Sequence, residues 1–529
     1  MRGVVPRRRS GRAHRQLLGA VCAALTLTFS SIGCSGSSDQ SAGGRTPATD
    51  PTTTATSSPR ASLSPSANPT VSTASCVRRP RSAAKVPEPK RLQVGESNPV
   101  EDPYYPQTSN PEIDVLHYFL DLGYRNGVLC GTATVTLRTM QPTETIRLDL
   151  ADALEVRTVT LDGYAVPFTH ESNGLTMTTR KLKRGRPHSL VIEYVGRPAP
   201  VRAPSKRADM SQGLGWNTAP DGTVYTFQEP YGAFTWYPAN DHPSDKALYD
   251  ARITTSSPDI GVFNGTLEDK RVGGGATTTR WHVEEPMATY LTTIAIGPYQ
   301  KYSGSTASGL AITYWLMDRD KRLLPRLHAA ARAGFDWLVV HAGPYPFSSL
   351  GFVVVGGESA METQTMVTLG RGQASFAGPN IQHEIAHQWY GDSVTPRTWQ
   401  GMWINEGWAE YLQQAFEAGT NPARLDRQMD KFRQYDAAGR RVAGPPGDYD
   451  PTRFGDTNVY VGPAVLLHEI RHRIGERRFE QVVKAWPAEH ENQNVDRAEF
   501  TNWIENFTHR NLASLIDRWL DSPSTPRPR

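Results

Sequence analysis

Two histidines four residues apart, with a glutamate directly after the first, occur in the stretch NIQHEIAHQWYGDS, residues 380–393. On a helix, His383 and His387 lie one turn apart and project from the same face, where both imidazoles can bind one metal ion. Glu384 lies beside them and can reach a metal-bound water as a general base. A helix with two solvated histidines explains the same five residues, so the pattern needs support from the rest of the chain.

The stretch WINEGWAEY, residues 403–411, supplies an anionic third ligand. Glu406 follows His387 after eighteen intervening residues, in a second helical stretch that returns the chain antiparallel to the first. Two histidines and one glutamate leave the fourth position of a tetrahedral zinc ion open for water, which marks a catalytic site. We therefore predict one Zn²⁺ per chain, bound by His383, His387 and Glu406. Glu410, one turn after Glu406, either orients a histidine or lies on a solvated helix face.

The helices that must carry these residues are predicted after about residue 306. The stretch 323–343 has apolar residues at helical spacing and ends at Gly343. Further helices are expected at 379–390, 404–418, 422–436, 460–474, 476–487 and 510–520. The tryptophans of this region are expected to form the core around the site: Trp389, Trp399, Trp403 and Trp408.

The preceding part of the chain, from about 110 to 305, has the pattern of β-structure. Short segments rich in β-branched and aromatic residues, such as GTATVTLRT and HSLVIEYVG, are separated by Gly, Pro, Asn and Asp. The segment ATYLTTIAIG, residues 288–297, is expected to be a strand of the same kind. This pattern predicts an antiparallel β-sandwich domain at 108–305, followed by a mainly helical catalytic domain at 306–529, and thus an α+β fold.

The N-terminus has the features of an export signal. Residues 1–33 contain six arginines and no acidic residue, and the apolar run 17–32 suits the hydrophobic region of a signal peptide. The segment ends SSIGC, so Cys34 follows a small residue as in bacterial lipoprotein signals, although Ser31 stands where that pattern prefers an aliphatic residue. We expect export, with either a lipid anchor on Cys34 that holds the protein at the cell membrane or plain secretion.

Residues 34–107 are predicted to be a Ser/Thr/Pro-rich flexible linker, because such a composition buries too little apolar surface to order the chain. The formal net charge is +4, and removal of the six signal-peptide arginines leaves about −2 (4 − 6), so no nucleic-acid partner is indicated. Membrane contact is expected only through Cys34. With Cys22 in the signal, Cys76 and Cys130 remain; in an exported protein they are expected to pair, the alternative being two separate thiols.

The order HEIAHQW then NEGWAEY resembles the zinc aminopeptidases of the aminopeptidase N and leukotriene hydrolase family, the gluzincins. The stretch TFQEPYGAFTWYPANDHPSDK is similar to the family's segment before the catalytic domain, which implies that Glu229 grips the substrate's free amine. The stretch VYVGPAVLLHEIR is similar to the segment whose tyrosine stabilises the tetrahedral intermediate, which implies that role for Tyr460.

The stretch GGESAMETQT resembles the family's Gly-x-Met-Glu-Asn signature. The resemblance implies that Glu362 is the main anchor of the substrate amine and that Ala360 and Met361 bind the substrate beside it. Two positions depart from the signature: Ser359 replaces its first glycine and Thr363 replaces its asparagine, so backbone hydrogen bonding to the substrate is expected to differ.

The resemblance covers roughly residues 110–525. It implies a saddle-like β domain, a thermolysin-like catalytic domain, and a zinc-dependent aminopeptidase that removes N-terminal residues from peptides with a free N-terminus. The chain ends soon after the catalytic helices, without the large helical C-terminal domain of many relatives, so an open cleft is expected. The alternatives are a catalytically silent surface binding module on the same fold and a hydrolase of a non-peptide substrate.

Overall fold

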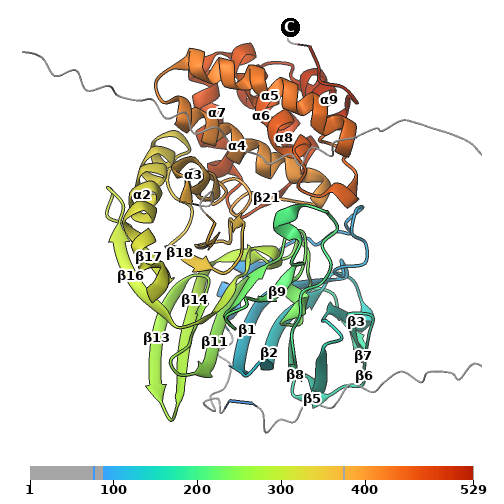
Figure 1. Ribbon diagram of the computed structural model, residues 1–529. Helices are drawn as coiled ribbons and strands as arrows, with labels where there is room; N and C mark the ends of the chain where they lie inside the picture. Colours follow the sequence, from blue (N-terminus) through green and yellow to red (C-terminus); the bar gives the residue numbers. More distant parts are fainter. Residues whose placement is uncertain (1–75, 78–86, 373–375, 528–529) are drawn as a thin grey trace, which may run out of the picture. The chain divides into compact units, whose positions relative to one another are not determined.

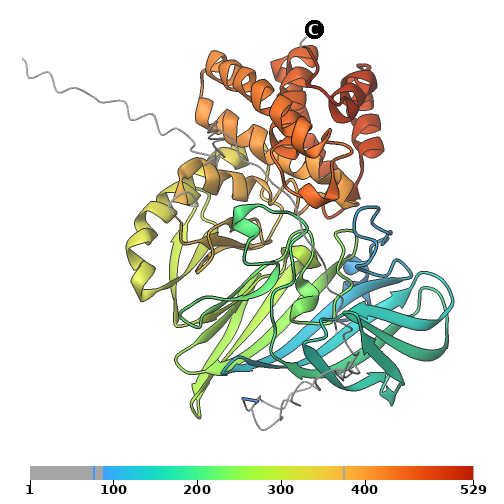
Figure 2. The ribbon, with the colours of Figure 1, turned by 45° about the vertical axis from the view of Figure 1, so that its right-hand side comes forward.

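The computed structural model describes residues 76–77, 87–372 and 376–527. The predicted signal peptide, Cys34 and residues 35–75 of the predicted linker lie outside these residues. The chain from 113 onward first forms a β-rich part and then a largely helical part, coloured from blue-green to red in Figures 1 and 2. This order of elements confirms the predicted α+β class.

The largest sheet of the β-rich part has eight strands in the order β13-β14-β11-β1-β2-β8-β4-β5. Neighbouring strands are antiparallel with one exception, because β1 and β11 run parallel. The strand β1 is buried along all but its last two residues, and its near-continuous apolar run is typical of a strand covered on both faces. The strands are β1 Ile113–Arg125, β2 Val128–Thr139, β4 Leu154–Leu161, β5 Tyr164–Ala165, β8 Pro187–Gly196, β11 Lys246–Ser256, β13 Thr266–Gly273 and β14 Ala276–Ala288.

Two smaller sheets complete this part. The first has three strands, β3 Thr143–Asp149, β7 Gly174–Leu182 and β6 Phe168–Glu171. The second has four strands, β12 Ile260–Phe263, β15 Ile294–Gly297, β10 Val224–Phe227 and β9 Gly215–Thr218. The expected strand at 288–297 is therefore only partly correct, because residues 289–291 form a 3₁₀ turn and β15 begins after it.

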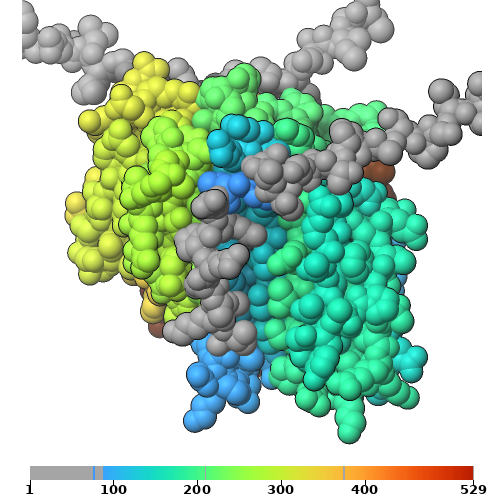
Figure 3. All heavy atoms as spheres, turned by 90° about the horizontal axis from the view of Figure 1, so that it is seen from below, coloured from blue at the N-terminus to red at the C-terminus, as the bar shows by residue number. Residues whose placement is uncertain are grey.

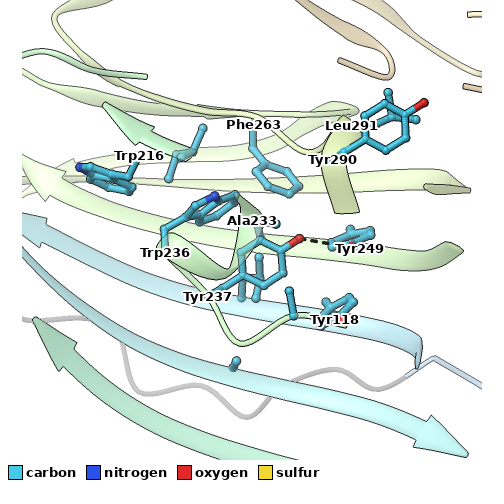
Figure 4. Close-up of a cluster of buried hydrophobic side chains, with 14 of the residues drawn as sticks. Tyr118, Trp216, Ala233, Trp236, Tyr237, Tyr249, Phe263, Tyr290 and Leu291 are labelled. Atoms are coloured by element: carbon cyan, nitrogen blue, oxygen red, sulfur yellow. Dashed lines mark hydrogen bonds between the residues drawn. The ribbon is translucent and has the colours of Figure 1, made fainter. Parts of the chain in front are cut away.

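A cluster of buried aromatic rings holds the four-stranded sheet and the eight-stranded sheet together (Figure 4). The rings of Tyr118 and Tyr249 stack with centroids 4.9 Å apart, and the hydroxyl of Tyr237 lies 3.4 Å from that of Tyr249. Trp236 belongs to the same cluster, and its indole Nε1 donates a hydrogen bond of 3.0 Å to Oε1 of Gln228. The cluster thus fixes Gln228, which follows β10 and directly precedes Glu229.

A five-stranded sheet in the order β16-β17-β18-β20-β19 follows in the chain. The pairs β17–β18 and β18–β20 are parallel. The sequence predicted only helices here, because buried runs as short as LGFVVV do not distinguish a strand from a helix. The hairpin of the first two strands spans the boundary predicted between residues 305 and 306. The bounds are β16 Tyr299–Ser305, β17 Ala311–Met317, β18 Leu350–Val355, β19 Ala360–Met361 and β20 Met366–Gly370.

The helical part contains most of the predicted helices, with changed ends. The helix predicted at 379–390 ends at Ala386, and the helix predicted at 422–436 continues to Ala443. The four tryptophans expected in the core are each at most 2% exposed. The helices are α2 Leu324–His341, α3 Gly378–Ala386, α4 Met402–Ala418, α5 Pro422–Ala443, α6 Asn458–Ile474, α7 Glu476–Glu489, α8 Arg497–Thr508 and α9 Ala513–Asp521.

The helix α8 was not predicted, although its sequence contains a motif that indicates the start of a helix. The side chain of Asp496 accepts a hydrogen bond from the backbone N–H of Glu499, and the side chain of Glu499 accepts one from the backbone N–H of Asp496. This capping box satisfies two of the N–H groups that every helix start leaves without an intrahelical partner. Aspartate followed three residues later by glutamate was the signal.

Residues 87–107 of the predicted linker pack against the rest of the chain, so the prediction of a flexible linker is wrong for this part. It contains the short helix α1 Pro89–Leu92, and it forms part of the described surface in the view from below (blue in Figure 3). Leu92 and Tyr105 are buried, and the carboxylate of Asp102 accepts a 2.7 Å hydrogen bond from the backbone N–H of Trp399. The sequence did not indicate these buried residues, because the average composition of 34–107 is polar.

Cys76 and Cys130 form a disulfide, with their Cα atoms 5.9 Å apart. This confirms the predicted pairing of these two cysteines and ties the segment before β1 to β2. Among the described residues, no helix has both the length and the apolar character needed to cross a membrane.

Candidate active site

The helix α3 presents His383 and His387 on one face. Ile381 and Ile385 are fully buried and anchor the helix, so His383 and the C-cap residue His387 lie on another face, where α4 and α6 meet them. The Nε2 atoms of the two rings are 3.0 Å apart, and the ring centroids are 4.7 Å apart at an interplanar angle of 80°. The two nitrogens therefore converge on one point.

Glu406 reaches the same point from α4. Its Oε2 atom lies 3.3 Å from Nε2 of His383 and 3.4 Å from Nε2 of His387. The side chain is buried, and Oε2 has no hydrogen-bond donor directed at it. The return of the chain through the α3–α4 connection brings together the three ligands predicted from the sequence.

The spacing and the chemistry of these atoms fit a zinc ion. Zinc ligands at about 2.0–2.1 Å in a tetrahedral arrangement are about 3.3 Å from one another. The three observed separations are 3.0, 3.3 and 3.4 Å. Two imidazoles and one carboxylate are ligands that zinc accepts, and three protein ligands leave one position open. His383, His387 and Glu406 would therefore hold the ion.

Charges around the triad favour a cation. Burial by itself would lower the pKa of His387 and raise that of Glu406. Their mutual attraction outweighs burial, so the pKa of His387 is well above its usual value and that of Glu406 is well below. The negative charges of Glu362 and Glu384 raise the pKa of His387 further. A divalent ion compensates this buried negative charge.

Asn405 orients one of the ligands and was missed in the sequence. Nδ1 of His387 donates a hydrogen bond of 2.6 Å to Oδ1 of Asn405, which leaves Nε2 for the metal. The amide nitrogen of Asn405 lies 3.4 Å from Oε1 of Glu362. The position of Asn405 directly before the ligand Glu406 is the sequence feature that could have indicated this role.

Glu410 lies beside the other histidine. Its Oε2 atom is 3.9 Å from Nδ1 of His383, and its side chain is 14% exposed. The amide nitrogen of Gln414 donates a 2.8 Å hydrogen bond to Oε1 of Glu410 and holds the carboxylate in place. This position is not a solvated helix face, but 3.9 Å is longer than a hydrogen bond and Nδ1 of His383 has no hydrogen-bond partner among the described residues, so an orienting role of Glu410 stays a prediction.

Glu384 follows His383 on α3, is buried, and lies close enough to His383 and His387 for their charges to act on its carboxyl group. Burial raises the pKa of its carboxyl group to about 7. A carboxyl group with a pKa near the working pH accepts and returns a proton readily, and a cation on the adjacent histidines shifts it toward the basic, charged form. This is the position and the acidity that a general base needs.

Glu229 and Glu362 bring a second pair of carboxylates to the site. Oxygen atoms of these two residues and of Glu406 all lie within 4.8 Å of one another. Oε1 of Glu229 is buried with no hydrogen-bond partner, and burial, followed by the charge of Glu362, raises the pKa of Glu229 well above its usual value. A protonated amine between these carboxylates would supply the missing donors and the opposite charge.

Different elements position these two carboxylates. Glu229 follows Gln228, whose amide nitrogen donates hydrogen bonds of 2.8 Å to the backbone oxygens of Thr289 and Thr292. Glu362 follows β19, and its backbone oxygen accepts a 3.0 Å hydrogen bond from the amide nitrogen of Gln388 on the α3 side. The β-rich part and the five-stranded sheet thus each contribute one carboxylate.

Ala360 and Met361 form β19, the last strand of its sheet in the described part of the chain. They pair antiparallel with Leu369 and Thr368 of β20. The outer edge of β19 offers backbone groups to an extended peptide in the same way as any sheet edge. Thr363, which departs from the signature, is fully buried, and its hydroxyl donates to the backbone oxygen of Met366, away from that edge.

Tyr460 stands in the first turn of α6, with its ring centroid 6.4 Å from that of His383. Nη1 of Arg207 donates a 3.2 Å hydrogen bond to the Tyr460 hydroxyl and a 2.5 Å hydrogen bond to the backbone oxygen of Gly455. Burial, followed by the charge of Glu406, raises the pKa of Tyr460 well above its usual value, so the hydroxyl keeps its proton. Arg207 was missed because no local pattern links it to a residue so far along the chain.

The close packing of α4 on α6 sets the place of Tyr460. A Cβ atom on Gly407 would lie 2.4 Å from Cβ of Pro463, which is closer than such atoms approach in proteins. Glycine at this position is therefore required for the two helices to meet. The ligand helix and the tyrosine helix are held together directly beside the metal triad.

Comparison with known proteins agrees with this geometry. The model of the peptidase M1 N-terminal domain matches residues 114–291, and that of the peptidase family M1 domain matches residues 343–519. Mouse aminopeptidase B is 25% identical over 483 residues, which span 78% of this chain and 70% of that protein. Aminopeptidase N of Lactobacillus delbrueckii is 23% identical, over 79% of this chain and 52% of that protein.

Solved structures show the same fold. An M1 zinc metallopeptidase from Deinococcus radiodurans aligns with a TM-score of 0.70 and 22% identity, over 81% of this chain and 98% of that chain. A variant of that enzyme bound to a Tyr-Ser-Ala substrate aligns with a TM-score of 0.69. The two domain models match in the expected order, and the second of them contains the metal triad. The chain therefore belongs to peptidase family M1.

Proposed function

We infer that this protein is a zinc-dependent aminopeptidase that removes N-terminal residues from peptides. One observation carries this inference, which is that the carboxylates of Glu229 and Glu362 lie next to the ligand Glu406. A metal triad alone would support cleavage at any position of a peptide. Two carboxylates beside it bind a free α-amino group, which is mostly protonated at neutral pH, and hold the first peptide bond over the metal.

The residues of the chain divide the work of hydrolysis. His383, His387 and Glu406 would hold a zinc ion, which would supply a lowered pKa of water and polarisation of the scissile carbonyl group. Glu384 takes the proton of the attacking water and passes it to the nitrogen of the leaving amine. The protonated hydroxyl of Tyr460 donates a hydrogen bond to the oxygen on which negative charge develops.

Hydrolysis of a fluorogenic aminoacyl amide, together with the zinc content of the purified protein, tests this function. The free aminoacyl amide should be cleaved, and its N-acetylated counterpart should be nearly inert because it has no charged amine. Bound zinc without turnover of any aminoacyl amide would favour a silent binding module. Efficient cutting of acetylated peptides at internal bonds would instead make the protein an endopeptidase.

We further propose that the protein is exported and held at the cell membrane by a lipid on Cys34. The arginine-rich start, the apolar run 17–32 and the small residues before Cys34 support this proposal. The disulfide between Cys76 and Cys130 supports export independently, because such bonds persist in oxidising compartments. Cys34→Ala should move the protein from the membrane fraction to the soluble fraction, and equal partitioning of both forms would leave plain secretion.

A further inference from the structure

A second group of side chains that can bind a metal ion lies between α5 and α6. These helices are neighbours in the upper part of Figure 1. His468 and His472 are one turn apart on α6, and Asp426 lies near the start of α5. The side chain of His468 is 4% exposed, whereas those of Asp426 and His472 are 46% and 58% exposed. None of the three takes part in the active site described above.

The ligand atoms of this group are spaced in the same way as those of the active-site triad. The Nε2 atoms of His468 and His472 are 3.0 Å apart, and Oδ1 of Asp426 lies 3.1 Å from the first and 3.5 Å from the second. The corresponding active-site distances are 3.0, 3.3 and 3.4 Å. The imidazole planes also meet at similar angles, 85° here and 80° there. Both groups match the separation expected around one tetrahedral ion.

A buried acceptor without a donor marks this group as it marks the active site. Oδ1 of Asp426 is inaccessible to solvent and accepts no hydrogen bond, although two imidazole nitrogens lie within 3.5 Å. Oε2 of Glu406 is in the same situation between its two histidines. Buried polar atoms in native structures have partners, so an orphan of this kind points to a ligand. A cation at the centre of the three atoms satisfies all of them.

The positive charges near this group are neutralised by carboxylates, so they do not oppose the binding of a cation. Besides His472 and Asp426, the charges that act on His468 are those of Arg433 and Arg471, and each arginine is paired with a carboxylate. Arg433 donates to Glu469, and Nε of Arg471 lies 2.6 Å from Oε2 of Glu476.

We propose that Asp426, His468 and His472 form a second binding site for a divalent first-row transition-metal ion such as Zn²⁺. Imidazole together with carboxylate suits this class of ion rather than Ca²⁺ or Mg²⁺. Because the side chain of His472 is 58% exposed, water would complete the coordination and the ion would exchange with the medium. The ion links α5 to α6, the helix whose other end carries Tyr460, and it stabilises the folded state to which it binds.

Zinc content tests the proposal directly. The mature chain, without a histidine tag, is stripped with a chelator, exposed to excess zinc and freed of unbound ion. The wild type should hold about two zinc ions per chain, and Asp426→Asn and His472→Ala should each hold about one. Asp430→Asn is the matched control, because Asp430 lies one turn further along α5 and is 75% exposed; it should keep both ions. The second ion is absent, and the proposal is wrong, if the wild type holds only one or if Asp426→Asn and His472→Ala keep both.

A thermal measurement separates this site from the active site. In Glu406→Ala the active-site triad is incomplete, so zinc should raise the Tm of this variant through the second site. Adding His472→Ala to it should remove that rise, whereas adding Asp430→Asn should not. A rise that survives His472→Ala would also overturn the proposal. Because His472→Ala leaves the catalytic groups in place, its aminopeptidase activity at saturating zinc should stay within about twofold of the wild type.

Discussion

Nδ1 of His387 lies 2.6 Å from Oδ1 of Asn405, the residue directly before the metal ligand Glu406. The backbone oxygen of Tyr390 is 3.0 Å from the same nitrogen, so the proton must sit on Nδ1 and the lone pair on Nε2. The other end of the amide faces Glu362 at 3.4 Å. One side chain thus connects the metal triad with the carboxylate proposed to bind the substrate amine.

Replacement of Asn405 by alanine should weaken zinc binding by about 10–100-fold, because the ring of His387 loses the acceptor that fixes its tautomer and orientation. Competition with a chelator of known affinity measures this. Asn405→Asp keeps an acceptor oxygen at the same place and should retain most of the affinity. Equal affinities of the wild type and Asn405→Ala would show that the backbone oxygen of Tyr390 is sufficient.

Glu384→Gln and Glu406→Ala should separate catalysis from metal binding. Glu384→Gln removes the base but no ligand, so zinc should remain bound while kcat falls by about 10²–10⁴-fold. Glu406→Ala removes a ligand and should lose the active-site zinc itself. Metal analysis and turnover of an aminoacyl amide on the same samples give both results. Near-normal turnover by Glu384→Gln would mean that the base is another group.

Glu362→Ala should lower kcat/KM for free aminoacyl amides by more than about tenfold while zinc stays bound. A charge-assisted hydrogen bond to the substrate amine contributes about 1.5–3 kcal/mol, which corresponds to roughly 10–150-fold. The exposed Glu358, four residues earlier, serves as the control, and Glu358→Ala should be close to the wild type. Equal losses on N-acetylated peptides and free peptides would show that Glu362 does not recognise the amine.

Gly407→Ala should disturb the contact between the ligand helix and the tyrosine helix. The new methyl group meets Pro463 at 2.4 Å, and relief of such overpacking costs about 1–3 kcal/mol of the free energy of unfolding. Displacement of α6 also moves Tyr460, so kcat should fall. Gly378→Ala at the start of α3 is the control, since no atom lies within 4 Å of its new Cβ; its stability should change by at most about 0.5 kcal/mol. Denaturant titration and turnover measure both effects.

Zinc affinity should fall as the pH is lowered. Burial lowers the pKa of His383 and His387, but Glu406 outweighs it and leaves both pKa values raised. Below these raised values the free rings carry protons that zinc must displace, so each pH unit toward acid should weaken zinc association by up to about 100-fold. Toward alkaline pH the dependence should disappear once the raised pKa values are passed. Chelator competition between pH 5 and pH 8 tests this, and an affinity independent of pH would contradict it.

The sequence by itself determined the chemistry of the active site. The spacing of His383 and His387 on one helix face, and the carboxylate on the next helix, follow from helix periodicity, which is a local property of the chain. Glu362 and Tyr460 were placed by their motifs, whereas export, which the composition of residues 1–33 indicates, stays a prediction. The pairing of Cys76 with Cys130 followed from the small number of cysteines left.

Only the tertiary structure decided which distant side chains support these groups. Arg207 reaches Tyr460, and the backbone oxygens of Thr289 and Thr292 hold Gln228 beside Glu229, because separate elements pack together. Asp426 approaches the histidines of α6, outside the active site, for the same reason. Such contacts depend on the paths of loops and on side chain packing, which leave no periodic signal in the sequence. The five-stranded sheet was hidden for a related reason, since short buried runs suit a strand and a helix equally well. The active site could be predicted because its ligands are local; its supporting contacts could not, because they are long-range.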